Sequence, residues 1–459
     1  MRIGIDFGTT HTSAAYYDGQ TIQAIPLDPH NANPNLLRSM IYITNAQRCS
    51  LGVEAVRTFL RQDTGRPVVY QKKVVGTIEN TVAQQFKMPG EPDGPITIIY
   101  DVIIEEDIGA QGRLLQSIKT GLRSDSYKGT NIFGKYYTIQ ELIALVLCHV
   151  RTQAERTLQT EVRQAVLGRP VQFSDDPAAD RRAEQRLCEA ARLAGFDEVS
   201  FVAEPVAAAS FYLNQVKKPE TALIFDFGGG TLDLTVMRVD AQQNEQILAT
   251  HGVLLGGDDL DSRLMREHVA SHFGTASSID KNYDDRTMPF PEDLADLLNQ
   301  WQTIPILSQP QHLAVIQRAK RYGADPSKFA ALACLVTKNH GFALFEEIEQ
   351  AKRTLSDQAQ AQLDMQVDEI NLALTLTRQD FNLAISQELT QARQGAREAI
   401  AKAGIKAIEV DAVVTTGGSS VIPIFQKMLA HEFPAARLVP LDTFSGVVRG
   451  LAIRAQTNT

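Results

Sequence analysis

The chain of 459 residues has few cysteines, one tryptophan and no long apolar run. Its four cysteines, Cys49, Cys148, Cys188 and Cys334, form no Cys-x-x-Cys pair, which argues against a zinc ribbon or a redox dithiol. We expect buried, reduced thiols. No stretch reaches the roughly 18 apolar residues of a membrane span, and the first residues lack a signal-peptide core. The sequence therefore predicts a cytoplasmic protein that does not contact membranes.

Positive charge is also in deficit. Lys and Arg total 45 against 54 for Asp and Glu, which gives a formal net charge of −9. A general nucleic-acid binder normally carries a basic surface, so we expect no nucleic-acid partner. Hydrophobic residues make up 44% and charged residues 22%, a globular composition. No linker or low-complexity tract divides the chain, so we expect one multi-lobed unit.

A short pattern occurs twice. Residues 3–10 read IGIDFGTT and residues 223–231 read LIFDFGGGT, and each is followed by a second apolar strand. Each copy is a strand, then Asp-Phe-Gly, then a turn of small residues. Such a turn can aim several backbone N–H groups at a phosphate. Asp6 and Asp226, at the strand ends, have the oxygen ligands that hydrated Mg²⁺ prefers. The duplication predicts two related lobes that share a phosphate site.

The remaining chain alternates strands and helices, which favours an α/β fold. We expect helices over 138–159, 180–194, 204–209, 346–355, 378–403 and 445–455, and strands over 165–170, 199–202, 363–367 and 410–416. Thr138 and Glu141 have the spacing of a capping box. Segment 274–345 contains five prolines and Trp301, and its sequence gives the least clear prediction of helices and strands.

Two other patterns are weaker. Residues 129–135 resemble a Walker A loop, but Tyr136 stands where the magnesium-binding Ser or Thr is required. His268 and His272 have helical i, i+4 spacing without an evident third ligand, so a zinc site there is not favoured. Asp-Phe-Gly also occurs in protein kinases, but the HRD and GxGxxG segments of a kinase are missing.

The chain resembles the actin-like ATPase superfamily and, more closely, the nucleotide-binding half of DnaK-type heat-shock chaperones. The matching segments are IGIDFGTTHTS, KKVVG, EPVAAA, LIFDFGGGTLDLTV, LLGGDDLD, EQAKRTLS and VVTTGGSSVIP. The resemblance implies an α/β, ribonuclease H-like fold of two duplicated βββαβα lobes around a nucleotide cleft. Lobe I would be 1–217 plus 438–459, with an insertion at about 39–115. Lobe II would be 218–437, with an insertion at about 257–387 that includes 274–345.

The resemblance also implies ATP or ADP with Mg²⁺ as ligands and assigns site residues. Asp6 and Asp226 would hold the water shell of the metal, and Thr9 would lie near the γ-phosphate. Lys72 would be the catalytic lysine, and Glu204 and Asp233 would surround the attacking water. The phosphate loops would comprise Gly8, Thr9, Thr10, His11, Gly228, Gly229, Gly230, Thr231, Gly256 and Gly257. Adenosine would meet Glu349, Lys352, Arg353 and Ser356, which share one helix face, opposite Gly417, Gly418, Ser419 and Val421.

Two departures bear on function. Val421 replaces an arginine that usually stacks on adenine, so we expect weaker or less base-selective binding. The chain ends just after residue 455, and we expect no peptide-binding domain. We therefore expect a slow, chaperone-like ATPase that acts through protein partners, with segment 274–345 as a partner surface. A non-hydrolysing, nucleotide-controlled binding module and a small-molecule kinase of the same superfamily stay open.

Overall fold

Two sheets, one of six strands and one of five, form the frame of the molecule. The computed structural model describes residues 1–82, 96–174, 176–213, 216, 218–242, 245–280, 288–441 and 446–457. The first sheet has the order β13-β12-β1-β2-β3, and β4 also pairs with β2. Its strands are β1 (Arg2–Phe7), β2 (His11–Tyr17), β3 (Ile22–Ala24), β4 (Leu36–Arg38), β12 (Gln164–Arg169) and β13 (Glu198–Ala203). We call the half of the molecule around this sheet lobe I.

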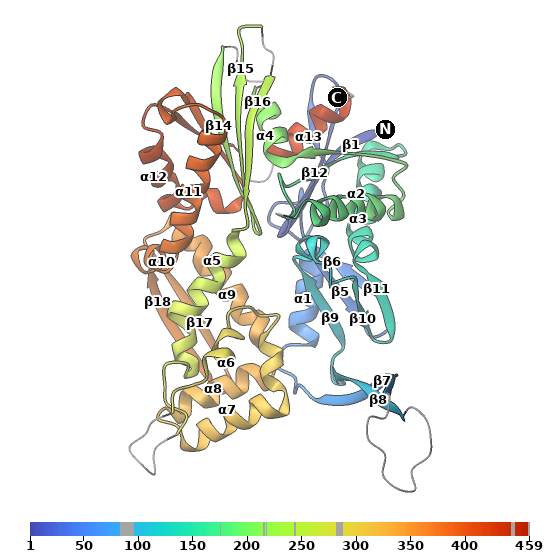
Figure 1. Ribbon diagram of the computed structural model, residues 1–459, viewed down its shortest axis with the longest axis vertical. Helices are drawn as coiled ribbons and strands as arrows, with labels where there is room; N and C mark the ends of the chain where they lie inside the picture. Colours follow the sequence, from blue (N-terminus) through green and yellow to red (C-terminus); the bar gives the residue numbers. More distant parts are fainter. Residues whose placement is uncertain are drawn as a thin grey trace.

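The second sheet has the order β16-β15-β14-β19-β20. It comprises β14 (Glu220–Phe227), β15 (Leu232–Val239), β16 (Glu245–Val253), β19 (Ala412–Thr416) and β20 (Arg437–Pro440). In both sheets the strand that ends in Asp-Phe-Gly is antiparallel to the next strand and parallel to a strand from far downstream. We call the half around this sheet lobe II. The two sheets face each other at the upper end of the molecule (Figure 1).

Most expected helices form close to the expected bounds. Helix α2 (Ile139–Leu158) begins at Thr138, whose hydroxyl accepts from Glu141 N at 3.1 Å, while the Glu141 carboxylate accepts from Thr138 N at 2.8 Å. Helix α3 (Pro177–Leu193) is followed by Gly195 in the left-handed region, at φ 93°. Both helices cover lobe I (Figure 1).

The single helix expected over 378–403 is wrong. The structure has α10 (Arg378–Ala384) and α11 (Ser386–Lys402), separated by Ile385 at φ −94° and ψ 19°. The Ile385 side chain is fully buried in the core of lobe II. The helical spacing of apolar residues predicted one continuous helix. Packing of Ile385 in the core instead interrupts it. Helix α12 (Pro423–Glu432) completes this side.

Two helices lie between the sheets. Helix α4 (Glu204–Leu213) and helix α13 (Gly446–Thr457) share an apolar cluster with residues of β12, β14 and β19. Gly450 approaches the helix backbone so closely that a Cβ there would lie 1.7 Å from Ala207 O. The small residues thus allow α4 and α13 to cross at the junction of the lobes (Figure 1).

Each lobe carries a lower part. In lobe I it contains α1 (Gly52–Gln62) and strands β5 (Met40–Thr44), β6 (Cys49–Leu51), β9 (Gly112–Gln116), β7 (Tyr70–Val82) and β8 (Ile96–Asp107). In lobe II it contains α5 (Gly257–Leu264), α6 (Glu292–Asp296), α7 (Pro310–Tyr322), α8 (Pro326–Thr337), α9 (Gly341–Asp357), β17 (Gln360–Val367) and β18 (Ile370–Thr377). Segment 274–345 therefore includes helices that pack into the lobe II core.

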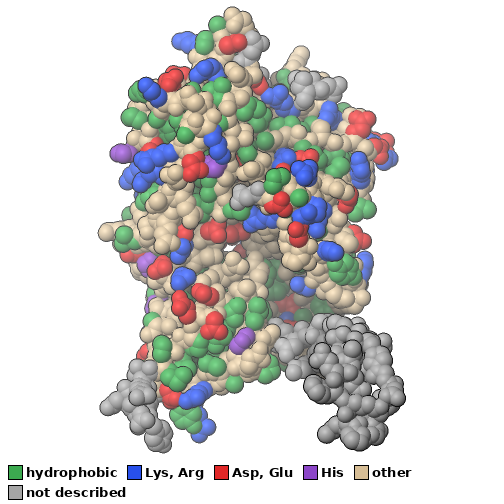
Figure 2. All heavy atoms as spheres, viewed as in Figure 1, with side chains coloured by type: hydrophobic (Ala, Val, Ile, Leu, Met, Phe, Trp, Pro, Cys, Tyr) green, Lys and Arg blue, Asp and Glu red, His purple; other side chains and the backbone are tan. Residues whose placement is uncertain are grey.

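The two lower parts contact each other. Gly65 N donates to Lys338 O at 2.8 Å, Val68 N donates to Thr337 O at 2.7 Å, and Asn339 Nδ2 donates to Asp63 O at 2.9 Å. We call this set of three hydrogen bonds the inter-lobe bridge. Beside it, the Trp301 ring packs 5.0 Å from Phe342 and 6.3 Å from Phe59, measured between centroids. Figure 2 shows positive and negative side chains interspersed over the face in view.

The structure also bears on the cysteines, the Walker-like segment and the search for a membrane-spanning helix. Cys334 is buried, but Cys49 and Cys148 are exposed and Cys188 is intermediate, so the prediction of four buried thiols is wrong. The Walker-like segment is a hairpin of β10 (Gly129–Ile132) and β11 (Lys135–Thr138), not a loop before a helix. In the described part of the chain, no helix combines the length and apolar character needed to cross a membrane.

Candidate functional site

The two Asp-Phe-Gly hairpins have the same loop geometry. Gly8 N donates to His11 O at 3.0 Å, and Gly228 N donates to Thr231 O at 3.0 Å. In the ladders, Asp6 lies opposite Ser13, and Asp226 lies opposite Asp233. The predicted repeat is therefore present as two loops with matching hydrogen bonds.

The loops touch each other across the interface of the lobes. A Cβ on Gly229 would lie 2.3 Å from Thr10 Cγ2, and one on Gly230 would lie 2.9 Å from Thr9 Oγ1. The helix α5 adds a third backbone segment, because a Cβ on Gly256 would lie 2.1 Å from Gly229 O. Only glycine fits this close backbone approach, which leaves a cradle of backbone groups at the loop tips.

A cavity of about 560 Å³ lies between the lobes over these loops. Ligand sites commonly have volumes of ~300–1,000 Å³. Nearly all predicted site residues with described side chains line it: Asp6, Gly8, Thr9, Thr10, His11, Glu204, Asp226, Gly228, Gly229, Gly230, Thr231, Gly257, Glu349, Lys352, Arg353, Ser356, Gly417, Gly418, Ser419 and Val421. Gly256 packs behind the second loop. Asp233 is buried and accepts from Val171 N at 2.8 Å.

One wall of the cavity carries an ion pair. The Lys119 ammonium lies 2.5 Å from the Glu204 carboxylate, and both side chains are buried. Lys119 comes from the short helix Ile118–Arg123 after β9, and Glu204 begins α4. Burial opposes the charge on Lys119, but the carboxylates of Glu204 and Asp6 outweigh it and raise its pKa. The ammonium is thus held charged at the cavity wall.

The neighbouring acids feel the same environment. Loss of hydration, followed by repulsion from Glu204, raises the pKa of Asp6 to about 7 and that of Asp233 to about 7. The same causes raise the pKa of Asp226 well above its ordinary value. His11 shows the opposite response, because desolvation lowers its pKa to about 4. Negative charge is therefore concentrated here beyond what Lys119 alone can neutralise.

The structure leaves the prediction for Lys72 untested. Lys72 lies in β7, and its side chain is outside the described residues. The lysine that sequence reasoning missed is Lys119, which lines the cavity and pairs with Glu204. The sequence offered one signal for it, a single lysine in an otherwise uncharged stretch, LLQSIKTGL.

The other side of the cavity is formed by α9 and the loop after β19. Lys352 Nζ donates to Asp261 Oδ2 at 2.6 Å and to Gly257 O at 3.0 Å. The Glu349 carboxylate contacts Arg353 at 2.5 Å and Arg38 of lobe I at 3.4 Å. These three cations outweigh desolvation and lower the pKa of Glu349. The predicted face of α9 thus points into the cavity.

The donor set fits a phosphate ester with a hydrated divalent cation. Side chains at Gly229 and Gly230 would clash with Thr10 and Thr9, so the backbone of the cradle borders the cavity directly, as a phosphate-binding loop requires. Asp6 and Asp226 have carboxylate oxygens, which Mg²⁺ prefers, and their raised pKa values reflect charge that a cation would neutralise. Arg353 and Val421, both lining the cavity, are half exposed and leave room for a planar base.

Comparison with known families agrees with this geometry. A family model described as Hsp70 protein matches residues 110–290 and 337–458, which is more than half of the chain. The match includes Lys119, Glu204, the second loop and the α9 face. It leaves out residues 1–109, which include the first loop, and residues 291–336, which make up most of segment 274–345. The chain therefore belongs to the Hsp70 family of chaperone-like, ATP-binding ATPases.

Proposed function

We propose that this protein binds Mg-ATP in the cavity between its lobes and hydrolyses it slowly, with the nucleotide state controlling contacts with protein partners. The observation that carries the proposal is the buried Lys119–Glu204 pair beside two matching loops. We also propose the duplicated βββαβα lobes, because the two sheets share one strand order. The boundary expected between residues 437 and 438 moves to the end of β20, since β20 pairs with β19 in the lobe II sheet.

The residues divide into three tasks. The two glycine loops and Thr9 bind the phosphates through N–H and O–H donors. Asp6 and Asp226 hold the hydrated Mg²⁺, which when bound neutralises charge on the phosphate oxygens. Lys119 takes the catalytic role that the sequence assigned to Lys72. It lies next to Glu204, so the ammonium can contact the γ-phosphate while the carboxylate contacts the attacking water.

Water activation falls to the acidic residues beside Lys119. Glu204 accepts a hydrogen bond from the Lys119 ammonium, which fixes the carboxylate in one orientation. Asp233 is held by Val171 N, and its pKa of about 7 suits a group that takes up a proton near neutral pH. Glu204, which lines the cavity, orients a water for in-line attack on the γ-phosphate, and the buried Asp233, which interacts with Glu204, is the final acceptor of the proton.

Lobe contacts connect the site with partners. Arg38 in lobe I makes a two-pronged ion pair with Glu346 on α9, at 2.7 and 2.8 Å. Ser117 Oγ donates to Asp258 Oδ2 at 3.0 Å across the same interface. A change in the bound phosphates shifts these contacts and with them the lower parts. The lobe II surface made by segment 274–345 is then the proposed partner surface.

A second function has one specific observation in its favour. A smaller cavity of about 240 Å³ shares Gly229, Gly230 and Asp258 with the nucleotide cavity and is also lined by Trp301 and Arg123. A small hydroxyl compound bound there would face the terminal phosphate, as a small-molecule kinase requires.

The test is ATP turnover with binding measured in parallel. Slow Mg-dependent hydrolysis by the wild type, lost in Asp6→Asn with binding retained, supports the ATPase. Binding without hydrolysis in both proteins supports a nucleotide-controlled binding module instead. ATP consumption that begins only when a sugar or another small alcohol is added supports the kinase.

A further inference from the structure

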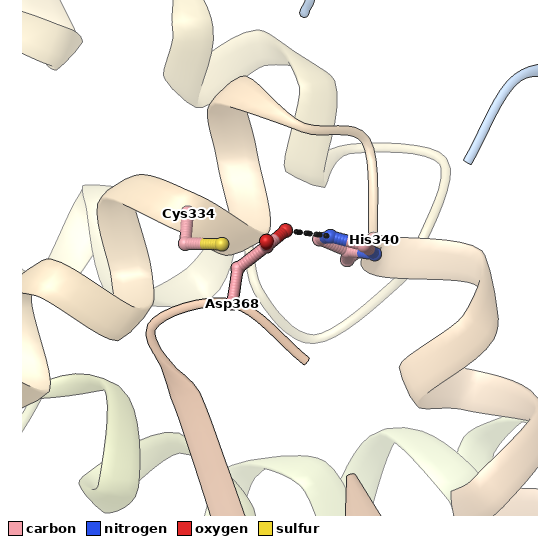
Figure 3. A group of neighbouring side chains, drawn as sticks. All are labelled: Cys334, His340 and Asp368. Carbon is pink, nitrogen blue, oxygen red and sulfur yellow. Dashed lines mark ion pairs between the residues drawn. The ribbon is translucent and has the colours of Figure 1, made fainter. Parts of the chain in front are cut away.

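Three side chains from separate elements of lobe II meet in its lower part (Figure 3). Cys334 lies in the last turns of α8, His340 directly precedes α9, and Asp368 lies in the turn between β17 and β18. The Cys334 Sγ, an imidazole nitrogen of His340 and a carboxylate oxygen of Asp368 all lie within 4.8 Å of one another. None of these groups takes part in the proposed ATPase site.

The histidine in this cluster has a buried nitrogen whose contact with Asp368 is a long one. His340 is only 3% exposed, and its Nε2 makes no hydrogen bond although it lies 3.5 Å from the Asp368 carboxylate. A buried polar nitrogen without a hydrogen bond is costly unless something else satisfies it.

The backbone positions these groups firmly. His340 N donates to Leu335 O at 3.0 Å, which closes the turn between α8 and α9. Asp368 lies in the left-handed region at φ 49°, in a turn fixed by the two-stranded ladder on either side. Three donors from three elements therefore converge without a flexible segment between them.

The surroundings already attract a cation. The Lys338 ammonium lies 3.0 Å from the Asp368 carboxylate, and Glu369 contacts the Cys334 thiol. Asp368 is partly exposed, so a small ion can reach the cluster from solvent. Cys334 is only 3% exposed, so a substrate cannot reach the thiol, which argues against a nucleophilic role. A small cation suits the cluster better than an organic ligand does.

We propose that Cys334, His340 and Asp368 bind a divalent cation of the zinc class. A thiolate, an imidazole and a carboxylate are the ligands of tetrahedral Zn²⁺, at bond lengths of ~2.0–2.3 Å. Such bonds place ligand atoms roughly 3.5 Å apart, so the donors need to close by about 1 Å through side-chain rotation. Glu369 or a water takes the fourth position. On binding, the Cys334 thiol releases its proton to solvent, and Lys338 gives up Asp368 to the metal.

Cobalt is the probe, because Co²⁺ replaces Zn²⁺ and its bond to a thiolate absorbs in the near ultraviolet. The full chain, reduced and stripped with a chelator, is titrated with Co²⁺ alone. We expect one equivalent per chain with a thiolate-to-cobalt band. We expect Cys334→Ser to lose the band and Cys148→Ser, at an exposed cysteine on α2, to keep it. A wild type without the band, or a band unchanged in Cys334→Ser, would overturn the proposal.

Two milder variants guard against misfolding. Asp368→Asn keeps a residue that tolerates the left-handed backbone, and we expect it to weaken Co²⁺ binding at least tenfold. Lys338→Ala removes the cation that competes for Asp368, and we expect about fivefold tighter binding, as for one exposed ion pair. Unchanged affinity in both variants would contradict the assignment.

Discussion

Lys119→Met gives the sharpest test of the site. The change keeps the apolar stem and removes the ammonium that lies 2.5 Å from Glu204. Methionine has nearly the same length, so the cavity keeps its shape. What is lost is the positive charge of Lys119 beside four carboxylates, those of Asp6, Glu204, Asp226 and Asp233.

The magnitude follows from two effects. Removing a preorganised charge that stabilises the transition state lowers turnover by about 10²–10³-fold. Breaking a buried ion pair from one side destabilises a fold by about 3–5 kcal/mol. Protonation offsets part of this cost, because the neighbouring Asp6 and Asp233 already have pKa values near 7. We therefore expect a folded variant whose stability deficit is smaller at pH 6 than at pH 8.

The assay is single-turnover hydrolysis of Mg-ATP, with nucleotide affinity measured separately by titration. Lys128→Met, at an exposed lysine, is the matched control and should behave as wild type. Lys72→Ala tests the rival assignment. Near-normal turnover by Lys119→Met, together with loss of turnover in Lys72→Ala, would refute the reasoning and return the catalytic role to Lys72.

Three further predictions concern other parts of the site. Asp233 has a pKa of about 7 in the fold and 3.8 ordinarily, so wild-type stability falls as pH rises through that interval. Urea unfolding of Asp233→Asn should therefore show an advantage over wild type that grows by up to about 1.4 kcal/mol per pH unit from pH 5 and levels off above pH 7. Val421→Arg should tighten ATP about two- to fivefold, because an exposed cation–π contact contributes ~0.5–1 kcal/mol; an equal gain for inorganic triphosphate, which has no base, would contradict this. Trp301→Ala removes the aromatic contact with Phe59 across the lobes and the hydrogen bond from Trp301 Nε1 to Gln116 Oε1 at 2.5 Å. We therefore expect a fluorescent ADP to dissociate about tenfold faster or more. Tyr322→Ala, at an exposed aromatic residue, is the control and should leave the dissociation rate unchanged.

Patterns of neighbouring residues were sufficient to predict the two glycine loops and most helices and strands. Asp-Phe-Gly with a run of small residues fixes the turn, because only glycine allows the contact between Gly229 and Thr10. The capping box at Thr138 and the stop at Gly195 likewise depend on neighbours in sequence. The i, i+3, i+4 spacing on α9 puts Glu349, Lys352 and Arg353 on one side of the helix, and all three line the cavity. Their contact with adenosine stays a prediction.

Features that depend on distant packing were not predictable. The break at Ile385 comes from burial in the lobe II core, which no local pattern encodes. Lys119 and Glu204 are 85 residues apart in the sequence and come into contact only in the folded lobe I. The Cys334 cluster has no metal-binding spacing in the sequence, since its third member comes from the β17–β18 hairpin. Each of these contacts joins elements that sequence reading treats separately.

The position of α13 has a consequence for how the protein is made. Its residues, 446–457, pack against β1 at the opposite end of the chain and against α4 at the lobe junction. During synthesis, the first strands and α4 leave the ribosome long before their covering helix exists. Until then, the apolar surface of Val166 and Ala208 stays open to water, and the two sheets lack the element that joins them. A nascent chain that stalls before residue 446 would itself be a substrate for chaperones.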